Sequence, residues 1–179
     1  MLSIENTALL IIDMQVKLTR VMTDKEALIA NLQKLIAGMQ VLNIPIIFTE
    51  QYPQGLGVTI PEIASLLPET KPITKMSFSC CTNENFLEKV KSLNRKQLLI
   101  TGIEAHVCVY QTVCDLLKMG YEVQVVADCI SSRTIENKTI AIEKMRGMGA
   151  QITSMEIALF ELLSTAESKH FKDISRIVK

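Results

Sequence analysis

Short, almost continuously apolar segments alternate along the chain with longer segments in which apolar residues recur every three to four positions. The longer segments predict amphipathic helices, of which the clearest carries its apolar stripe from Leu28 to Met39. The capping box Thr23-Asp24-Lys25-Glu26 predicts where that helix begins. The short segments predict strands that are covered on both faces. There are six: Ala8–Ile12, Ile44–Thr49, a weaker one near Pro72–Met76, Gln97–Thr101, Tyr121–Ala127 and Ala150–Thr153.

This alternation of strands and helices predicts a parallel sheet. Short connections between a strand, a helix and the next strand are typical of right-handed βαβ units. We therefore expect an α/β protein with a three-layer, doubly wound sheet of about six mostly parallel strands. Without repeats or linkers, residues 1–179 are interpreted as one domain. Neither GxGxxG nor GxxxxGK[ST] occurs, so a phosphate-cradling loop is not predicted and no cofactor is expected.

The amino-acid composition limits the possible binding partners and the cellular compartment of the protein. The formal net charge of zero gives no electrostatic support for binding nucleic acid or an anionic membrane surface. No apolar run approaches the roughly 18 residues of a membrane helix, and the N-terminus has no basic region typical of a signal peptide. The five cysteines form no CxxC pair and the two histidines lack ligand spacing to a cysteine pair. We expect a cytoplasmic protein without a metal site, acting on a small molecule.

Three chemically complementary residues follow strand ends. Asp13 closes the first predicted strand, Lys75 follows the third and Cys108 follows the fourth. Function in open α/β sheets gathers at the carboxyl ends of the strands, so these side chains are expected to meet. Cys108 falls at the start of the next predicted helix, where the helix dipole favours the thiolate. Singly, each residue has an ordinary structural interpretation: a buried thiol, a turn carboxylate, a solvated lysine. Together they supply a nucleophile, a base and a cation.

The segments Ala8–Gln15, Ile73–Ser79 and Thr101–Val109 resemble the isochorismatase-like cysteine hydrolases in sequence, order and strand placement. The resemblance covers nearly the whole chain and implies a Rossmann-like sheet ordered 3-2-1-4-5-6 with an Asp13–Lys75–Cys108 triad. It also implies a cis peptide between His106 and Val107. With that bond, the N–H groups of Val107 and Cys108 would form an oxyanion hole.

The segment after the second strand separates the chain from better-known members of that superfamily. Nicotinamidases carry a histidine-containing metal site there, whereas Phe48–Gly57 contains no histidine. The Thr-Glu-Gln-Tyr-Pro run within it is similar to the metal-free branch that contains isochorismatase domain-containing proteins. Retention of Cys108 argues against isochorismate, because hydrolysis of a vinyl ether needs no nucleophile. Candidate side chains for substrate binding are Gln15, Gln51, Tyr52 and Phe78, of which the two aromatic ones fit a core or interface equally well.

The leading hypothesis is a metal-independent cysteine hydrolase that cleaves a small amide-type or related C–N bond through a thioester. One alternative is a redox-sensing thiol protein in which Cys80 or Cys81 resolves an oxidised Cys108. The other is a non-catalytic oligomeric module that retains the fold. A homo-oligomer is expected because the Gly- and Pro-rich connection Glu50–Lys71 is predicted to expose Leu56, Val58 and Ile60.

Overall fold

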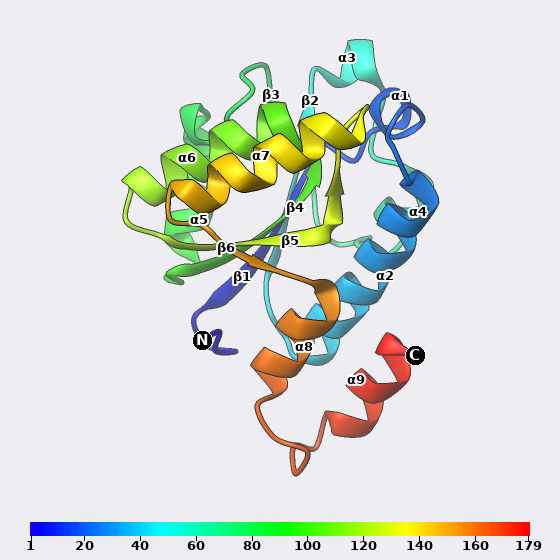
Figure 1. Ribbon diagram of the computed structural model, residues 1–179, viewed down its shortest axis with the longest axis vertical. Coiled ribbons are helices and arrows are strands. Elements are labelled where there is room, and N and C mark those ends of the chain that lie inside the picture. Colours follow the sequence, from blue (N-terminus) through cyan, green and yellow to red (C-terminus); the bar gives the residue numbers. More distant parts are fainter.

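The sheet has the predicted size, direction and order. The computed structural model covers residues 1–179 and is shown in Figure 1. Its strands are β1 (Thr7–Ile12), β2 (Ile46–Gln51), β3 (Ile73–Lys75), β4 (Gln97–Ile103), β5 (Glu122–Ser131) and β6 (Gln151–Thr153). All neighbouring strands pair in parallel, in the order β3-β2-β1-β4-β5-β6. The predicted α/β fold and the strand order implied by the resemblance are confirmed.

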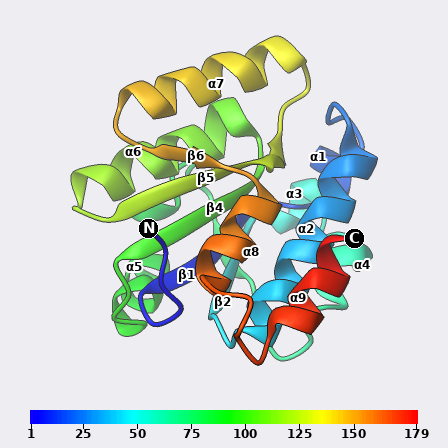
Figure 2. The ribbon, with the colours of Figure 1, turned by 60° about the horizontal axis from the view of Figure 1, so that its bottom comes forward.

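Helices cover both faces of the sheet. One face carries α2 (Lys25–Val41), α4 (Pro61–Ala64), α8 (Met155–Leu163) and α9 (Phe171–Val178). The other carries α5 (Glu84–Ser92), α6 (Tyr110–Lys118) and α7 (Ile135–Gly147). Figure 2 shows α6 and α7 on one side of the sheet and α2, α8 and α9 on the other. None of the helices combines the length and the apolar character needed to span a lipid bilayer.

The central strand β1 joins the two cores. Leu9 and Ile11 face the α2 side, whereas Ala8, Leu10 and Ile12 face the α6 side, and all five are buried. Each fully buried aliphatic side chain contributes on the order of 1.5–3 kcal/mol by leaving water. Because alternate residues of a strand point to opposite faces, only a strand that is apolar throughout can serve both cores.

Glycine is required where β1 and β4 end. Gly102 has φ +107°, and a Cβ at this position would lie 2.0 Å from the carbonyl oxygen of Ile12. Any side chain would push the two strands apart. The residues that follow them, Asp13 and the turn that carries Cys108, are therefore held close together.

Two local features differ from the prediction: the end of strand β5 and the start of helix α2. Strand β5 continues to Ser131 because its register with β4 shifts between Ile100 and Gly102, which inserts extra residues. The capping box does not form: α2 begins after Asp24, whose side chain makes no capping hydrogen bond. The Thr23 hydroxyl instead donates to the carbonyl oxygen of Arg133 at 3.1 Å, so a tertiary contact replaces the local one.

The Gly- and Pro-rich connection is more ordered than an open loop. It contains α3 (Pro53–Leu56) as well as α4, and an antiparallel bridge ties Thr59 to Gln15. Val58 is 61% exposed as predicted, but Ile60 is only 5% exposed. The Ile60 N–H donates to the Met14 carbonyl and its side chain joins the α2-side core, which explains why it is not at the surface.

Candidate functional site

A buried ion pair lies at the carboxyl edge of the sheet. Asp13 directly follows β1 and Lys75 is the last residue of β3, so both side chains start from strand ends at the same edge. Lys75 Nζ lies 2.6 Å from Asp13 Oδ2, and the two side chains are 1% and 0% exposed. Such a pair is stable only when its remaining hydrogen-bonding capacity is also satisfied.

Neighbouring groups complete the ion pair. The Thr49 hydroxyl, on β2, donates to Asp13 Oδ1 at 2.7 Å. Lys75 also donates to the carbonyl oxygens of Ser77 and Phe78, each at 3.2 Å. Burial is the largest single influence and lowers the pKa of Lys75, but the opposing influences, led by the negative charge of Asp13, together outweigh it and the pKa is raised overall. Lys75 is therefore a cation at neutral pH.

Cys108 is the nucleophile candidate beside this pair. It lies in the short π-helical turn η2 (Ala105–Val109) that connects β4 to α6, and it is 4% exposed. Its thiol donates to Gln51 Oε1 across 2.9 Å. Burial, and then the charge of Asp13, raise the pKa of Cys108, and Lys75 opposes them only in part. The direction of this pKa change is opposite to the one expected from the helix-start position, and it favours the protonated thiol in the resting protein.

The predicted cis peptide is wrong in position. The non-proline cis bond joins Ile103 to Glu104, at the end of β4, and not His106 to Val107. His106 and Val107 lie within the η2 turn, and the peptide bond between them is not cis. The Val107 N–H donates to the Glu104 carbonyl at 3.0 Å, so it is engaged within the turn and is not an oxyanion donor here. A role of the Cys108 N–H in an oxyanion hole stays a prediction.

The four predicted substrate-binding residues have different surroundings. Gln15 is fully buried and its side chain bonds the backbone N–H and C=O of Gln51, at 2.8 and 2.9 Å. Its place is therefore structural, since it fixes the chain at Gln51. The Gln51 side chain contacts the Cys108 thiol and the Lys75 ammonium group. Tyr52 and Phe78 are 46% and 51% exposed, so neither is a core residue.

Two residues near the pair were missed or undervalued by sequence reasoning. Thr49 lies inside an apolar strand, and its parallel pairing with Ile12 is the signal that would have placed it beside Asp13. Cys80, which enters from sequence as a candidate resolving thiol in the redox alternative, lies with its sulfur 3.9 Å from the Thr49 hydroxyl. Burial raises the pKa of Cys80 to about 11, while Lys75 lowers it.

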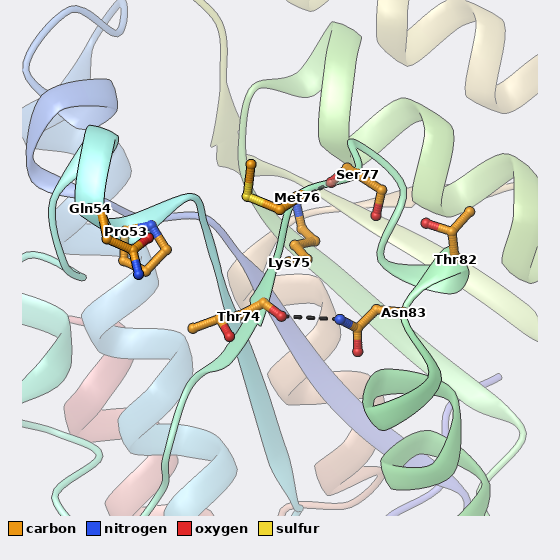
Figure 3. Close-up of a pocket in the computed structure, with 8 residues that line it drawn as sticks. All are labelled: Pro53, Gln54, Thr74, Lys75, Met76, Ser77, Thr82 and Asn83. Carbon is orange, nitrogen blue, oxygen red and sulfur yellow. Dashed lines mark hydrogen bonds between the residues drawn. The ribbon is translucent and has the colours of Figure 1, made fainter.

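A cavity of about 510 Å³ opens beside Lys75 (Figure 3). Figure 3 shows the Lys75 side chain directed along the strand toward Ser77, and Asn83 bonded to the Thr74 carbonyl at 3.0 Å. Most residues in the wall of this cavity are polar and uncharged, and Cys108 is not one of them. The lining residues are Pro53, Gln54, Thr74, Lys75, Met76, Ser77, Thr82 and Asn83.

No group of three or more His, Cys, Asp or Glu side chains is arranged to hold a metal ion. Glu50, the carboxylate at the end of β2, is occupied within the protein. Its Oε1 accepts from the N–H and the hydroxyl of Thr59, at 2.7 and 2.8 Å. These bonds hold the β2–α4 connection against the sheet.

The fold and the site define a parallel α/β protein with a buried carboxylate–ammonium pair and a cysteine at the carboxyl edge of its sheet. Residues 7–157 match the family described as Isochorismatase domain. The chain belongs to the isochorismatase family and has its hydrolase fold.

Individual relatives agree with this assignment. Isochorismatase domain-containing protein 2 of Danio rerio is 37% identical over 178 residues, which cover 99% of this chain and 89% of that protein. The MAR1 ribonuclease of Caenorhabditis elegans matches with a TM-score of 0.94 and 34% identity, over 99% of this chain and 91% of that one. YcaC of Pseudomonas aeruginosa, solved with hexane-2,5-diol and covalent acrylamide, matches with a TM-score of 0.91 and 26% identity, over 97% and 89%. The predicted similarity to isochorismatase domain-containing proteins is confirmed.

Proposed function

We propose that the protein is a cysteine hydrolase that cleaves a small amide-type C–N bond through a thioester, with Asp13, Lys75 and Cys108 as its catalytic residues. The observation that carries the proposal is the buried Asp13–Lys75 pair, with 2.6 Å between Nζ and Oδ2, next to a thiol whose pKa is raised by burial and by the charge of Asp13. A protonated thiol beside a carboxylate is a nucleophile with its own general base.

In the first half-reaction the Cys108 sulfur attacks the carbonyl carbon and the thiol proton passes to Asp13. The carbonyl electrons move to the oxygen, which becomes an oxyanion beside the Lys75 ammonium. When the C–N bond breaks, its electron pair goes to nitrogen and Asp13 gives nitrogen the proton. A neutral amine leaves and the acyl group remains on sulfur. Lys75 holds the carboxylate in place throughout and offsets the negative charge that develops.

In the second half-reaction Asp13 accepts a proton from water as the water oxygen attacks the thioester carbon. The C–S bond breaks with its electrons on sulfur, which takes the proton back from Asp13. The products are a carboxylic acid and the original thiol. No other reactant is required.

We propose a small, uncharged substrate rather than a nucleic acid. The cavity beside Lys75 has no other cationic side chain in its wall, and the hydrogens of Lys75 are already used within the protein. Affinity for a nucleic-acid backbone comes mainly from Lys and Arg side chains that neutralise phosphates, so we do not extend to this chain the ribonuclease activity in the name of the MAR1 relative. Covalent acrylamide in the YcaC structure supports a small carboxamide as a ligand of this fold.

We also propose a metal-independent reaction, a self-associating protein and a cytoplasmic location. Metal independence is supported by the Glu50 carboxylate, which is occupied by Thr59. Self-association is supported by the exposed apolar side chains Val58, Met76 and Phe78 on the connections near the site. Five free, buried cysteines favour a reducing compartment.

The test is a screen of small neutral amides and ureido compounds for release of amine, with and without a chelator. We expect turnover that persists in the chelator, falls by several orders of magnitude in Cys108→Ser and Lys75→Ala, and leaves these variants folded. Peroxide-dependent formation of a Cys108 disulfide with no turnover would favour the redox alternative. A folded protein that neither turns over nor acylates would favour the non-catalytic module.

A further inference from the structure

The Gln51 side chain lies between the Cys108 thiol and the Lys75 ammonium group and contacts both. Its Oε1 accepts from the Cys108 thiol at 2.9 Å and from Lys75 Nζ at 3.3 Å. Lys75 can only donate, so the amide atom that faces it must be the oxygen. The carboxamide nitrogen points the other way and reaches the Met76 carbonyl at 3.5 Å, the longest of these contacts.

Lys75 has no hydrogen to spare for a substrate. An ammonium group carries three hydrogens, whereas Lys75 already faces four acceptors: Asp13 Oδ2, Gln51 Oε1 and the carbonyls of Ser77 and Phe78. The Gln51 contact is the longest of the four. Asp13 is held by charge, and the two carbonyls belong to the backbone. Gln51 Oε1 is therefore the acceptor that can be exchanged at the lowest cost.

The backbone of Gln51 is fixed by two hydrogen bonds, so only its side chain can turn. The Gln15 carboxamide bonds both backbone polar groups of Gln51, so the main chain cannot withdraw. Rotation of the side chain alone would break its contacts with Cys108, Lys75 and the Met76 carbonyl and would uncover Cys108, which is 4% exposed. A substrate carbonyl oxygen could replace the first two of these contacts.

We propose that the Gln51 carboxamide occupies, in the resting protein, the position of the substrate carbonyl group, and that a neutral carboxamide-type substrate binds by displacing it. This inference rests on the proposed hydrolase function and names the group that the site recognises. The substrate oxygen takes over the Lys75 hydrogen that Gln51 gives up, and the thiol is released at the same moment. A carboxylate is disfavoured at this position because Asp13 already neutralises the Lys75 ammonium group, and a second negative charge beside the pair would be repelled by Asp13. Gln51 is thus a specificity-determining residue.

The test measures alkylation of Cys108 by iodoacetamide, followed by peptide mass spectrometry, in the full-length protein. Gln51→Ala and Gln51→Ser cannot reach the sulfur and are expected to alkylate at least about fivefold faster than the unaltered chain, the effect of losing one hydrogen bond. Gln111→Ala is the matched control, since Gln111 is an exposed glutamine on α6, and its rate is expected to stay unchanged. Circular dichroism verifies that each variant is folded. If one of the two Gln51 variants fails to fold, the other is sufficient for the test.

A second arm tests the recognised group. Acetamide is expected to protect Cys108 at a lower concentration in Gln51→Ala than in the unaltered chain, because its site is already vacated, and acetate is expected not to protect. Equal or slower alkylation in both Gln51 variants, or protection by acetate as strong as by acetamide, overturns the proposal. These readouts need no turnover: amide turnover without faster alkylation would leave the hydrolase standing and remove only the role of Gln51. Faster alkylation of Cys108 without turnover of any amide would keep the role of Gln51 and remove the proposed hydrolase function.

Discussion

Replacing Asp13 with asparagine isolates the buried charge of Lys75. The Asp13→Asn variant keeps the size of the side chain and an oxygen for the Thr49 hydroxyl, but it leaves an ammonium group that is 1% exposed without a counter-ion. Removing one partner of a buried pair typically costs about 3–5 kcal/mol of unfolding free energy. We expect a loss of this size near neutral pH, together with loss of turnover, because the general base is gone.

The pH dependence of that loss follows from the sign of the pKa change. In the unaltered chain the pKa of Lys75 is raised, so Lys75 adds no pH dependence below 10.5. In Asp13→Asn the charge that raised the pKa of Lys75 is gone. Burial, which lowers this pKa, then dominates, and we expect the pKa of Lys75 to fall below its value in the unfolded chain. The folded variant then sheds the Lys75 proton more easily than the unfolded chain, and its stability rises with pH. The destabilisation should shrink by about 1.4 kcal/mol per pH unit above the new pKa.

The assay is urea unfolding of both proteins from pH 6 to 8.5, below the ordinary pKa of 9.0 for the cysteines, so that these contribute little. The double variant Asp13→Asn/Lys75→Met is the control, since it removes the buried charge and should show no such pH dependence. A destabilisation below about 1 kcal/mol across the whole range would refute the conclusion that Lys75 depends on Asp13 for its charge.

Three further predictions concern other parts of the site and the assembly. Thr49→Val removes the hydroxyl bond to Asp13 Oδ1 and should lower kcat about tenfold with little change in KM; an unchanged kcat would show that Thr49 does not position the carboxylate. The pKa of Cys80 is raised from 9.0 to about 11, so its contribution to stability is complete below pH 9 and is lost as the pH rises to 11. The unaltered chain should lose about 3 kcal/mol more than Cys80→Ala over that interval in denaturant titrations, and parallel losses would contradict the assignment. Light scattering at micromolar concentration should give a mass well above the 20.0 kDa of one chain, and a monomer mass would end the proposal of self-association.

The strands and the three catalytic candidates could be predicted from sequence because both are set by local patterns. Near-continuous apolar runs in a βαβ alternation leave few arrangements of a parallel sheet, and residues that follow strand ends must gather at one edge. Asp13, Lys75 and Cys108 were found in this way. The Thr23–Glu26 capping box failed because the Thr23 hydroxyl bonds to Arg133, which is 110 residues away along the chain.

The finer properties of the site could not be predicted because they depend on burial and on contacts between distant residues. The helix-start position of Cys108 suggested a thiolate, but desolvation and the charge of Asp13 outweigh the helix dipole and Lys75. The bond between Gln51 and Cys108 joins residues 57 positions apart and depends on how Gln15 fixes the β2 end.

The central claim is that Cys108 attacks a carbonyl carbon and carries the acyl group. It is tested most directly by rapid acid quenching during turnover of an amide found in the screen, followed by peptide mass spectrometry. The account predicts that the peptide with Cys108 gains the mass of the acyl group, that hydroxylamine removes it, and that no adduct forms in Asp13→Asn. Steady turnover with an unmodified Cys108 at every quench time, or an acyl group on Cys80 or Cys81 instead, would contradict it.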